Sequence, residues 1–240
     1  MLKAIFFDAA GTLFEAREPV GRTYARIARE YGLDAPEAAV IEGFRRAFAA
    51  APVIAFGRGH RAGELRALER GWWRAVVADS FAGLGVFPNL DRCFEALFAY
   101  FADPAHWKAD PSAVATLAGL KQAGFELGVI SNFDFRLYGL LDGLGLRAYF
   151  DSITISSEAG YAKPRREIFD TALARHRTSA AEAMHVGDSL HHDFEPARAL
   201  GFFAVLLDPK QAAPELCEVR AVRINALANL SMVTQRLKIA

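Results

Sequence analysis

Short apolar runs begin the chain and recur through its second half. The runs occupy residues 4–7, 127–130, 153–155, 184–186 and 203–207. Each run is apolar at consecutive positions, which is typical of parallel strands that are covered on both faces. Segments with helical spacing, such as residues 164–176 and 193–200, separate the later runs. Strands that alternate with helices predict an α/β fold with a Rossmann-like, mainly parallel sheet.

Residues 16–103 interrupt this alternation. No run in this stretch resembles a strand, and apolar residues such as Tyr24, Ile27 and Tyr31 follow helical spacing. Glycine and proline residues divide the stretch into about four helices. We therefore expect an all-helical cap, inserted after the first strand and standing over its end. The predicted domains are an α/β core of residues 1–15 and 104–240 and a helical cap of residues 16–103.

The composition is that of a globular protein without a dominant charge. Hydrophobic residues make up 52% of the chain, and 28 Lys and Arg residues balance 28 Asp and Glu residues. This balance gives no electrostatic reason to expect a nucleic acid or a membrane surface as partner. No apolar stretch approaches the ~18–20 residues that span a bilayer, and the N-terminal run does not read as a signal peptide. We predict a cytoplasmic protein, in which Cys93 and Cys217 indicate neither a disulfide framework nor a zinc site.

Polar residues follow several of the predicted strands. They are Asp8, Ser131, Asn132, Asp188 and, five residues later, Asp193, while Lys163 stands at the start of a predicted helix. Taken singly, each of these except Asp8 is more typical of a turn, a helix cap or the surface. Ligands of an open parallel sheet gather at the carboxyl ends of its strands, however, so the set together predicts one polar site there.

The residue types of this set suit a metal ion and a phosphate group. Asp8, Asp188 and Asp193 would supply the hard oxygen ligands that Mg²⁺ prefers. Lys163 would offset the repulsion among these carboxylates and a bound phosphate. Ser131 and Asn132 would donate hydrogen bonds to phosphate oxygens. The turn at Gly11 and Thr12 is expected to offer free backbone N–H groups that can cradle an anion.

Four segments resemble the four motifs of the haloacid dehalogenase (HAD) superfamily, in the same order. They read FDAAGTLF, ISNFD, AKPRREIF and HVGDSLHHD. The resemblance covers about residues 2–16 and 110–207, and the helical insertion resembles the cap of the haloacid dehalogenase-like subclass. The segments SNFDFRL, KPRREIF and HVGDS are most similar to the DREG-2-like group, that is, the haloacid dehalogenase-like hydrolase domain-containing proteins.

The resemblance implies Mg²⁺-dependent hydrolysis of a small phosphorylated metabolite, a phosphate ester. Asp8 would be the nucleophile that forms a covalent aspartyl intermediate. Ser131 and Lys163 would hold the transferring group, with Asn132 as a further donor. Asp188 would bind the metal directly, and Asp193 would support it or orient its water ligands.

One position departs from the pattern of HAD phosphatases, which carry a second Asp two residues after the nucleophile. Here the residue is Ala10, whose backbone carbonyl can still bind the metal. The missing carboxyl would protonate the leaving group and activate the hydrolytic water, help that is worth roughly 10²–10⁴ in rate. Its loss would raise the barrier by ~3–5 kcal/mol. The loss is severe for alkyl phosphates and mild where the leaving group departs as a stable anion.

Three alternatives follow from Ala10. Phosphonoacetaldehyde hydrolases also carry Ala at this position, but they use a cap lysine, and residues 16–103 contain none. The 2-haloacid dehalogenases need no leaving-group acid, and halide release without metal would identify one. The cap arginines that could hold their carboxylate or halide are Arg22, Arg26, Arg45 and Arg46. The third alternative is a catalytically weak protein that binds a phosphorylated ligand or a protein partner without turnover.

Two further groups lie near the predicted site. His191 and His192 stand between Asp188 and Asp193, where an imidazole could replace the missing acid and base. More often, histidines at such positions are exposed loop residues. Asp134 is expected to cap the helix that follows it.

Overall fold

The computed structural model describes residues 1–211 and 220–239, so Cys217 lies outside the described residues. Its centre is a six-stranded sheet, in which every neighbouring pair of strands is parallel. The strands are β1 (Ala4–Phe7), β4 (Glu126–Ser131), β5 (Ser152–Ile155), β6 (Ala183–Gly187), β7 (Phe203–Leu207) and β8 (Ala221–Ile224). The predicted Rossmann-like parallel sheet is confirmed, and each of the five apolar runs forms a strand.

The strand order places a crevice beside β1. The order across the sheet is β5-β4-β1-β6-β7-β8, so the chain builds outward from β1 to one edge and then returns to build the other side. Neighbouring strands β1 and β6 are therefore followed by connections that run to opposite sides. Ligands of doubly wound sheets bind outside the carboxyl ends of the strands at this switch point. Asp8 directly follows β1, and Asp188 directly follows β6.

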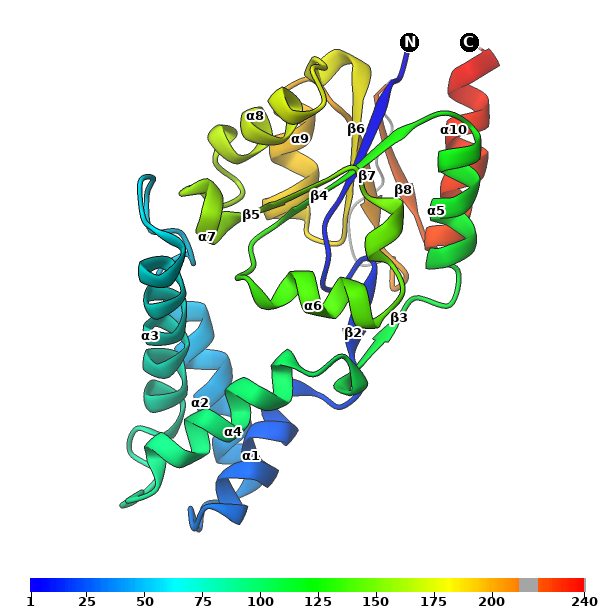
Figure 1. Ribbon diagram of the computed structural model, residues 1–240. Coiled ribbons are helices and arrows are strands. Elements are labelled where there is room, and N and C mark those ends of the chain that lie inside the picture. The colour runs from blue at the N-terminus through cyan, green and yellow to red at the C-terminus, as the bar shows by residue number, and fades with distance from the viewer. Residues whose placement is uncertain (212–219, 240) are drawn as a thin grey trace.

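Helices cover both faces of the sheet (Figure 1). One face packs against α5 (Ala113–Gln122), α6 (Arg136–Gly143) and α10 (Leu230–Ile239), and the other packs against α8 (Arg166–Arg175) and α9 (Glu195–Ala199). Successive strand residues point to opposite faces. In β1, Ile5 and Phe7 join the first hydrophobic cluster, while Phe6 joins the second. Burial of both faces explains why the strands are apolar at consecutive positions.

The remaining short elements connect these layers. They are α7 (Ser156–Ala159), a π-helical segment at Leu190–Phe194, and 3₁₀ turns at Pro104–His106, Arg147–Tyr149, Ala180–Glu182 and Leu227–Asn229.

Four helices fill the segment between β1 and the rest of the sheet, which confirms the all-helical insertion. They are α1 (Val20–Glu30), α2 (Glu37–Ala50), α3 (Ala62–Phe81) and α4 (Leu90–Ala102). Pro19 and Pro36 stand just before α1 and α2, where a missing N–H group breaks no helical hydrogen bond. The four helices bury a hydrophobic cluster of their own that includes Tyr24, Val77 and Leu97.

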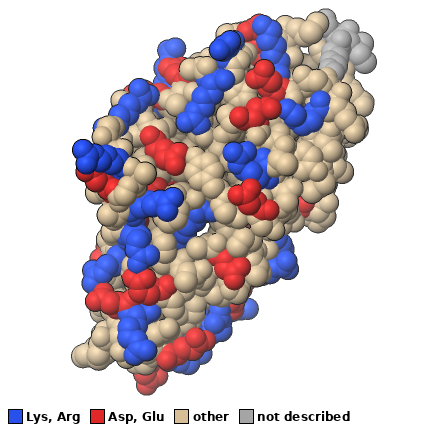
Figure 2. Space-filling model, viewed as in Figure 1, with Lys and Arg blue, Asp and Glu red and all other residues tan. Residues whose placement is uncertain are grey.

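A two-stranded antiparallel ribbon joins the helical insertion to the sheet. It pairs β2 (Phe14–Ala16) with β3 (Trp107–Ala109). The insertion thereby lies at the carboxyl end of β1, on the side of the sheet where Asp8 emerges (Figure 1). Figure 2 shows basic and acidic side chains interspersed over this view of the molecule. Among the described residues, no helix combines the length and the hydropathy that a membrane crossing requires.

Candidate active site

Lys163 links two buried carboxylates at the carboxyl end of the sheet. Its Nζ atom lies 2.6 Å from Oδ1 of Asp8 and 2.5 Å from Oδ1 of Asp193. Burial by itself would lower the pKa of Lys163, but the two carboxylates outweigh burial and raise it. The ammonium group therefore stays charged. Burial raises the pKa of Asp8, and Lys163 opposes this rise.

Asp193 is held from several sides. His185 Nε2 lies 3.0 Å from Asp193 Oδ1, and the backbone N–H of Ser189 donates to Oδ2 at 3.1 Å. Burial opposes ionisation of Asp193, but Lys163 and His185 together lower its pKa. Because an ionised carboxylate only accepts hydrogen bonds, His185 must carry its proton on Nε2. With its oxygens engaged by the protein, Asp193 is suited to orienting its neighbours.

Three carboxylates gather beside this lysine. Asp8, Asp188 and Asp193 each place an oxygen within 4.8 Å of the other two. Loss of solvation in the crevice, reinforced by the charges of Asp8 and Asp193, raises the pKa of Asp188 to about 6. Lys163 therefore does not fully neutralise the cluster, and a cation at this position would be attracted by the remaining negative charge.

Two glycines allow the carboxylates to approach. A Cβ atom on Gly11 would lie 2.3 Å from Oδ2 of Asp188, and Gly11 also has a φ of +94°. A Cβ atom on Gly187 would lie 2.3 Å from Cγ of Asp193. Any larger residue at these two positions would collide with a carboxylate of the cluster.

The turn after Asp8 does not offer the free N–H groups that the sequence suggested. The N–H of Gly11 donates to Phe14 O at 2.8 Å, and the N–H of Thr12 donates to Ala9 O at 3.2 Å. That prediction was wrong because a turn this tight satisfies its own donors. Gly11 remains important for space rather than for hydrogen bonding, and Thr12 is buried.

Ser131 is the last residue of β4 and Asn132 follows it, and both contribute to the wall of the cavity around Asp8. Asn132 has a role that the sequence did not reveal. Its Oδ1 accepts from the backbone N–H of Lys163 at 2.7 Å, and its Nδ2 donates to the backbone carbonyl of Lys163 at 2.9 Å. The side chain therefore clamps the backbone of Lys163 and positions its ammonium group.

A cavity of about 600 Å³ lies over these residues. The core supplies its polar wall, and the helical insertion supplies the opposite, apolar wall. The polar wall includes Asp8, Ser131, Asn132, Lys163, Asp188 and Asp193, and the apolar wall includes Phe48, Pro52, Val53, Ile54 and Trp72. The site thus lies between the sheet and the insertion, which together shield it.

The insertion is fastened to the core by buried hydrogen bonds. Ser156 Oγ donates to the carbonyl of Ile54 at 2.7 Å, and Trp73 Nε1 donates to Oδ2 of Asp134 at 2.6 Å. Asp134 accepts the backbone N–H of Arg136 at the first residue of α6, as predicted, and also pairs with the Arg136 guanidinium at 2.6 Å. These contacts hold the insertion against the core.

The two neighbouring histidines differ in their surroundings. His192 borders the cavity around Asp8, and its Nδ1 lies 3.2 Å from Oγ of Ser189. Partial burial and the nearby His191 lower the pKa of His192. His191 is exposed and lies 3.9 Å from a carboxylate oxygen of Glu195. A neutral His192 could accept a proton but is poorly suited to supply one.

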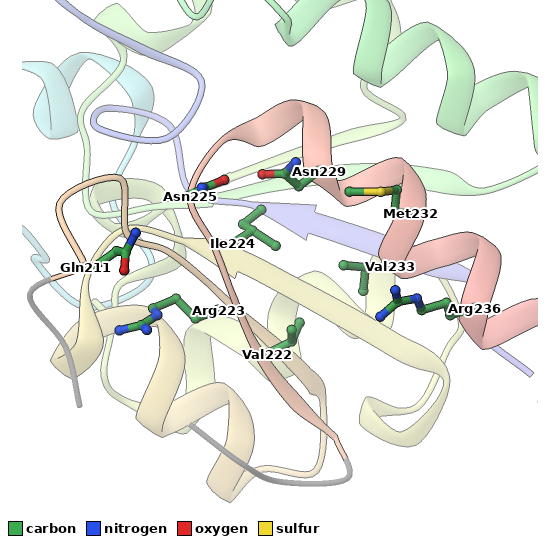
Figure 3. A pocket seen from close by; sticks show the side chains of 9 residues that line it. All are labelled: Gln211, Val222, Arg223, Ile224, Asn225, Asn229, Met232, Val233 and Arg236. Atoms are coloured by element: carbon green, nitrogen blue, oxygen red, sulfur yellow. The ribbon is translucent and has the colours of Figure 1, made fainter. Parts of the chain in front are cut away.

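A separate groove of about 390 Å³ lies between β8 and α10 (Figure 3). Its walls include Arg223, Asn229 and Arg236, and none of the predicted site residues contributes to it. Arg223 lies 3.7 Å from a carboxylate oxygen of Asp208. The groove is therefore distinct from the carboxylate cluster.

The doubly wound sheet, the helical insertion after its first strand and the acidic cluster at the switch point define an α/β protein with a candidate active site between its sheet and its insertion. The chain belongs to the haloacid dehalogenase-like hydrolases, whose family model matches residues 2–201. The family assignment made from the motifs is confirmed.

Similar proteins agree with this assignment. Haloacid dehalogenase-like hydrolase domain-containing protein 3 of Homo sapiens is 36% identical over 88% of this chain and 84% of that protein. Glyceraldehyde 3-phosphate phosphatase of Methanocaldococcus jannaschii is 35% identical over 53% of this chain and 57% of its own.

Solved structures share the fold. A HAD phosphatase from Thermococcus onnurineus has a TM-score of 0.69 at 22% identity, over 97% of this chain and 98% of its own. A 2-haloacid dehalogenase from Pseudomonas syringae has a TM-score of 0.68 at 24% identity, over 99% of this chain and 100% of its own.

Proposed function

We propose that this chain is a Mg²⁺-dependent phosphatase that acts through a covalent intermediate on Asp8. The observation that carries the proposal is the position of Lys163, 2.6 Å from Asp8 and within the three-carboxylate cluster. Asp8 thus lies beside a cationic side chain, Lys163, and within a candidate cation site. Positive charges placed beside the nucleophile suit the binding of a phosphate dianion. The phosphatase of Methanocaldococcus jannaschii, a partial relative, supports the same chemistry.

The carboxylate cluster fits a divalent cation. Three carboxylate oxygens within 4.8 Å of one another form a hard donor set, and the raised pKa of Asp188 reflects the negative charge that a cation would relieve. Asp8, Asp188 and the carbonyl of Ala10 would hold Mg²⁺, and Asp193 would orient the surrounding groups. Bound Mg²⁺ would neutralise charge on the phosphate oxygens.

The reaction would proceed in two displacements. A carboxylate oxygen of Asp8 attacks phosphorus, the bond between phosphorus and the ester oxygen breaks, and the leaving group departs with the electron pair. Ser131 and Lys163 bind the transferring phosphoryl group. Water then attacks the aspartyl phosphate, which releases inorganic phosphate and restores Asp8.

The leaving group would find no acid at Ala10, which borders the cavity where a second carboxyl would be needed. We expect phosphate esters whose leaving group departs as a weakly basic anion to react well. Alkyl esters, whose alkoxide leaving group is strongly basic, should react poorly.

We further propose that residues 16–103 act as a cap domain over a core of residues 1–15 and 104–240. Cap closure would exclude water and bring Phe48, Ile54 and Trp72 against the substrate. The ribbon of β2 and β3 is the connection about which the cap would move.

The dehalogenase alternative receives less support. Three of the four cap arginines expected to hold a carboxylate or halide form ion pairs instead: Arg22 with Glu37, Arg26 with Glu18 and Glu30, and Arg45 with Glu42. Among the described residues, no arginine contributes to the wall of the cavity around Asp8. Similarity in fold to a dehalogenase at 24% identity does not outweigh this.

The test is phosphate release from 4-nitrophenyl phosphate and from a sugar phosphate, each with and without Mg²⁺. We expect Mg²⁺-dependent turnover of the aryl ester, slow turnover of the alkyl ester, and none in Asp8→Asn. Halide release from a 2-haloacid without metal would instead establish the dehalogenase alternative. Ligand binding without turnover of any ester would favour the non-catalytic one.

A further inference from the structure

A second cavity, of about 430 Å³, adjoins the cavity around Asp8. Its volume lies in the range of small-molecule sites, roughly 300–1,000 Å³. The residues that border both cavities are Ala10, Phe48, Ile54, Trp72, Asn132 and Phe133. A ligand that reacts at Asp8 can therefore extend its remaining part past Ala10 into this second space.

Aromatic rings from the cap and the core form the walls of the second cavity, which we call the aromatic chamber. The rings include Phe44, Phe48, Trp72, Trp73, Trp107 and Phe133. Phe48 stands at the junction of the two cavities and stacks on Phe44 and Trp73, with ring centroids 5.6 and 6.1 Å away. Phe48 is 49% exposed, so its ring remains accessible to a ligand.

The indole N–H groups and the guanidinium group that border the chamber are already bound to the protein. The indole N–H of Trp72 donates to the carbonyl of Pro52 at 2.7 Å. That of Trp73 donates to Oδ2 of Asp134 at 2.6 Å, and that of Trp107 donates to the carbonyl of Phe101 at 3.2 Å. The guanidinium of Arg136 pairs with Asp134. A sugar placed against these rings would find few partners for its several hydroxyl groups, and each buried unpaired group costs about 1–3 kcal/mol.

The chemistry beside Asp8 points to the same kind of ligand. Ala10 borders both cavities, so the leaving group would pass the residue that supplies no proton. A phenol has a pKa of about 10, as in tyrosine, and can depart as an anion. An alkyl alcohol resembles water, whose pKa is about 15.7, and needs a proton to depart. An aromatic leaving group therefore suits both the chamber and the missing acid.

We propose that the substrates are phosphate monoesters of aromatic alcohols, with the phosphate at Asp8 and the ring in the aromatic chamber. This inference rests on the proposed phosphatase function. Asp8 attacks phosphorus, the bond from phosphorus to the aryl oxygen breaks, and the aryloxide leaves with the electron pair. The aryloxide takes a proton from water to become a phenol. Water hydrolyses the aspartyl phosphate, breaking its bond from phosphorus to the Asp8 oxygen, so inorganic phosphate is released and Asp8 is restored.

A binding experiment tests the chamber without requiring turnover. The chain has three tryptophans, Trp72, Trp73 and Trp107, and all three border the chamber, so tryptophan fluorescence reports its occupancy. Benzylphosphonate, which is not hydrolysed, would be titrated into the protein with saturating Mg²⁺, with methylphosphonate as the ligand that lacks the ring. We expect benzylphosphonate to bind at least about tenfold more tightly, a difference of about 1.4 kcal/mol.

Variants locate the ring. We expect Phe48→Ala to remove most of the preference for benzylphosphonate, and Phe48→Leu to remove part of it. Leu68→Ala serves as the matched control, because Leu68 is 38% exposed on the same cap and borders neither cavity. Equal affinities for the two phosphonates, no binding of benzylphosphonate, or an unchanged preference in both Phe48 variants would overturn the inference.

A kinetic comparison separates this inference from the proposed phosphatase function. Acetyl phosphate has a good leaving group but no ring, whereas 1-naphthyl phosphate has both. We expect a lower KM for 1-naphthyl phosphate than for acetyl phosphate. The ratio of kcat/KM for 1-naphthyl phosphate to kcat/KM for acetyl phosphate should fall about tenfold in Phe48→Ala. Turnover of acetyl phosphate without preference for the aryl ester would refute the aromatic substrate alone. Turnover of neither would refute the phosphatase function itself.

Discussion

At the scale of single residues, the charge balance of the site depends on Lys163. Its ammonium group is buried between Asp8 and Asp193, and Asn132 holds its backbone from both the N–H and the carbonyl side. Asp188, at the exposed edge of the cluster, lacks such a partner and titrates at a raised pKa. Each of these residues supports a separate prediction.

Replacement of Lys163 by methionine should destabilise the protein strongly. The substitution keeps the chain length but leaves two buried carboxylates without their cation, and breaking a buried pair costs about 3–5 kcal/mol. Urea unfolding without metal would measure the loss. Lys108→Met is the control, because Lys108 pairs with Glu15 at the surface, where a pair contributes about 0–1 kcal/mol. Equal losses in the two variants would contradict the assigned role of Lys163.

Replacement of Ala10 by aspartate should restore acid catalysis. We expect hydrolysis of alkyl phosphates to rise by up to about 10²–10⁴, with a much smaller gain for aryl phosphates. The measurement is kcat/KM for one ester of each kind in both proteins. Ala10→Asn has a similar size but cannot donate a carboxyl proton, and an equal gain in that variant would refute the explanation.

Affinity for Mg²⁺ should depend on pH through Asp188. Its pKa is raised to about 6, so the metal-free carboxyl is largely protonated below that pH and ionised above it. The same shift means that the metal-free fold loses stability as pH rises from about 4 to about 6. Mg²⁺ should bind more tightly between pH 5 and 7 as pH rises, and should release protons near pH 6. Calorimetry in buffers of different ionisation enthalpy measures this release, which Asp188→Asn should reduce, while Asp8, whose pKa is also raised, can still contribute.

At the scale of elements, contacts between α3 and the start of α6 hold the helical insertion against the core. Trp73 donates to the buried Asp134, and Glu69, also on α3, accepts the backbone N–H of Phe135 at 3.2 Å. Glu69 is buried, and its pKa is raised by that burial. Two residues one helical turn apart thus hold α3 against the same short segment of the core.

Trp73→Phe should loosen this contact. The variant keeps an aromatic ring but leaves Asp134 without one donor, at a cost of about 1–3 kcal/mol. Hydrogen exchange of the cap amides should rise relative to those of the sheet. Trp72→Phe removes an exposed hydrogen bond to Pro52, and it should change the stability and the hydrogen exchange of the cap amides much less. If the two variants behave alike, the bond to Asp134 does not hold the cap.

At the scale of the whole molecule, a cation at the switch point would join the ends of β1 and β6. A ligand that binds only the folded state stabilises it by mass action, by about 2.7 kcal/mol at a concentration 100 times its Kd. We therefore expect Mg²⁺ to raise the thermal midpoint of the wild type and to leave that of Asp188→Asn nearly unchanged. A Mg²⁺ effect of equal size in both proteins would contradict binding at the carboxylate cluster.

Much of the architecture could be predicted from local patterns. Runs that are apolar at consecutive positions became strands buried on both faces, and the stretch without such runs became helices. Asp8, Asp188 and Ser131 converge because the carboxyl ends of parallel strands meet at one edge, which follows from the strand positions alone. The absence of a carboxyl at Ala10 was also evident from the sequence, whereas the catalytic roles of all these residues stay predictions.

Only the tertiary structure decided which groups meet across the chain. Asn132 clamps Lys163, His185 supports Asp193, and rings of the cap and the core surround one chamber. The N–H groups of Gly11 and Thr12, expected to be free, are bonded within their own turn. Local hydrophobic periodicity specifies which face of an element is buried, but it carries no information on how a closed insertion is oriented against its core. That orientation, and the contacts it creates, define the shape of the candidate substrate site.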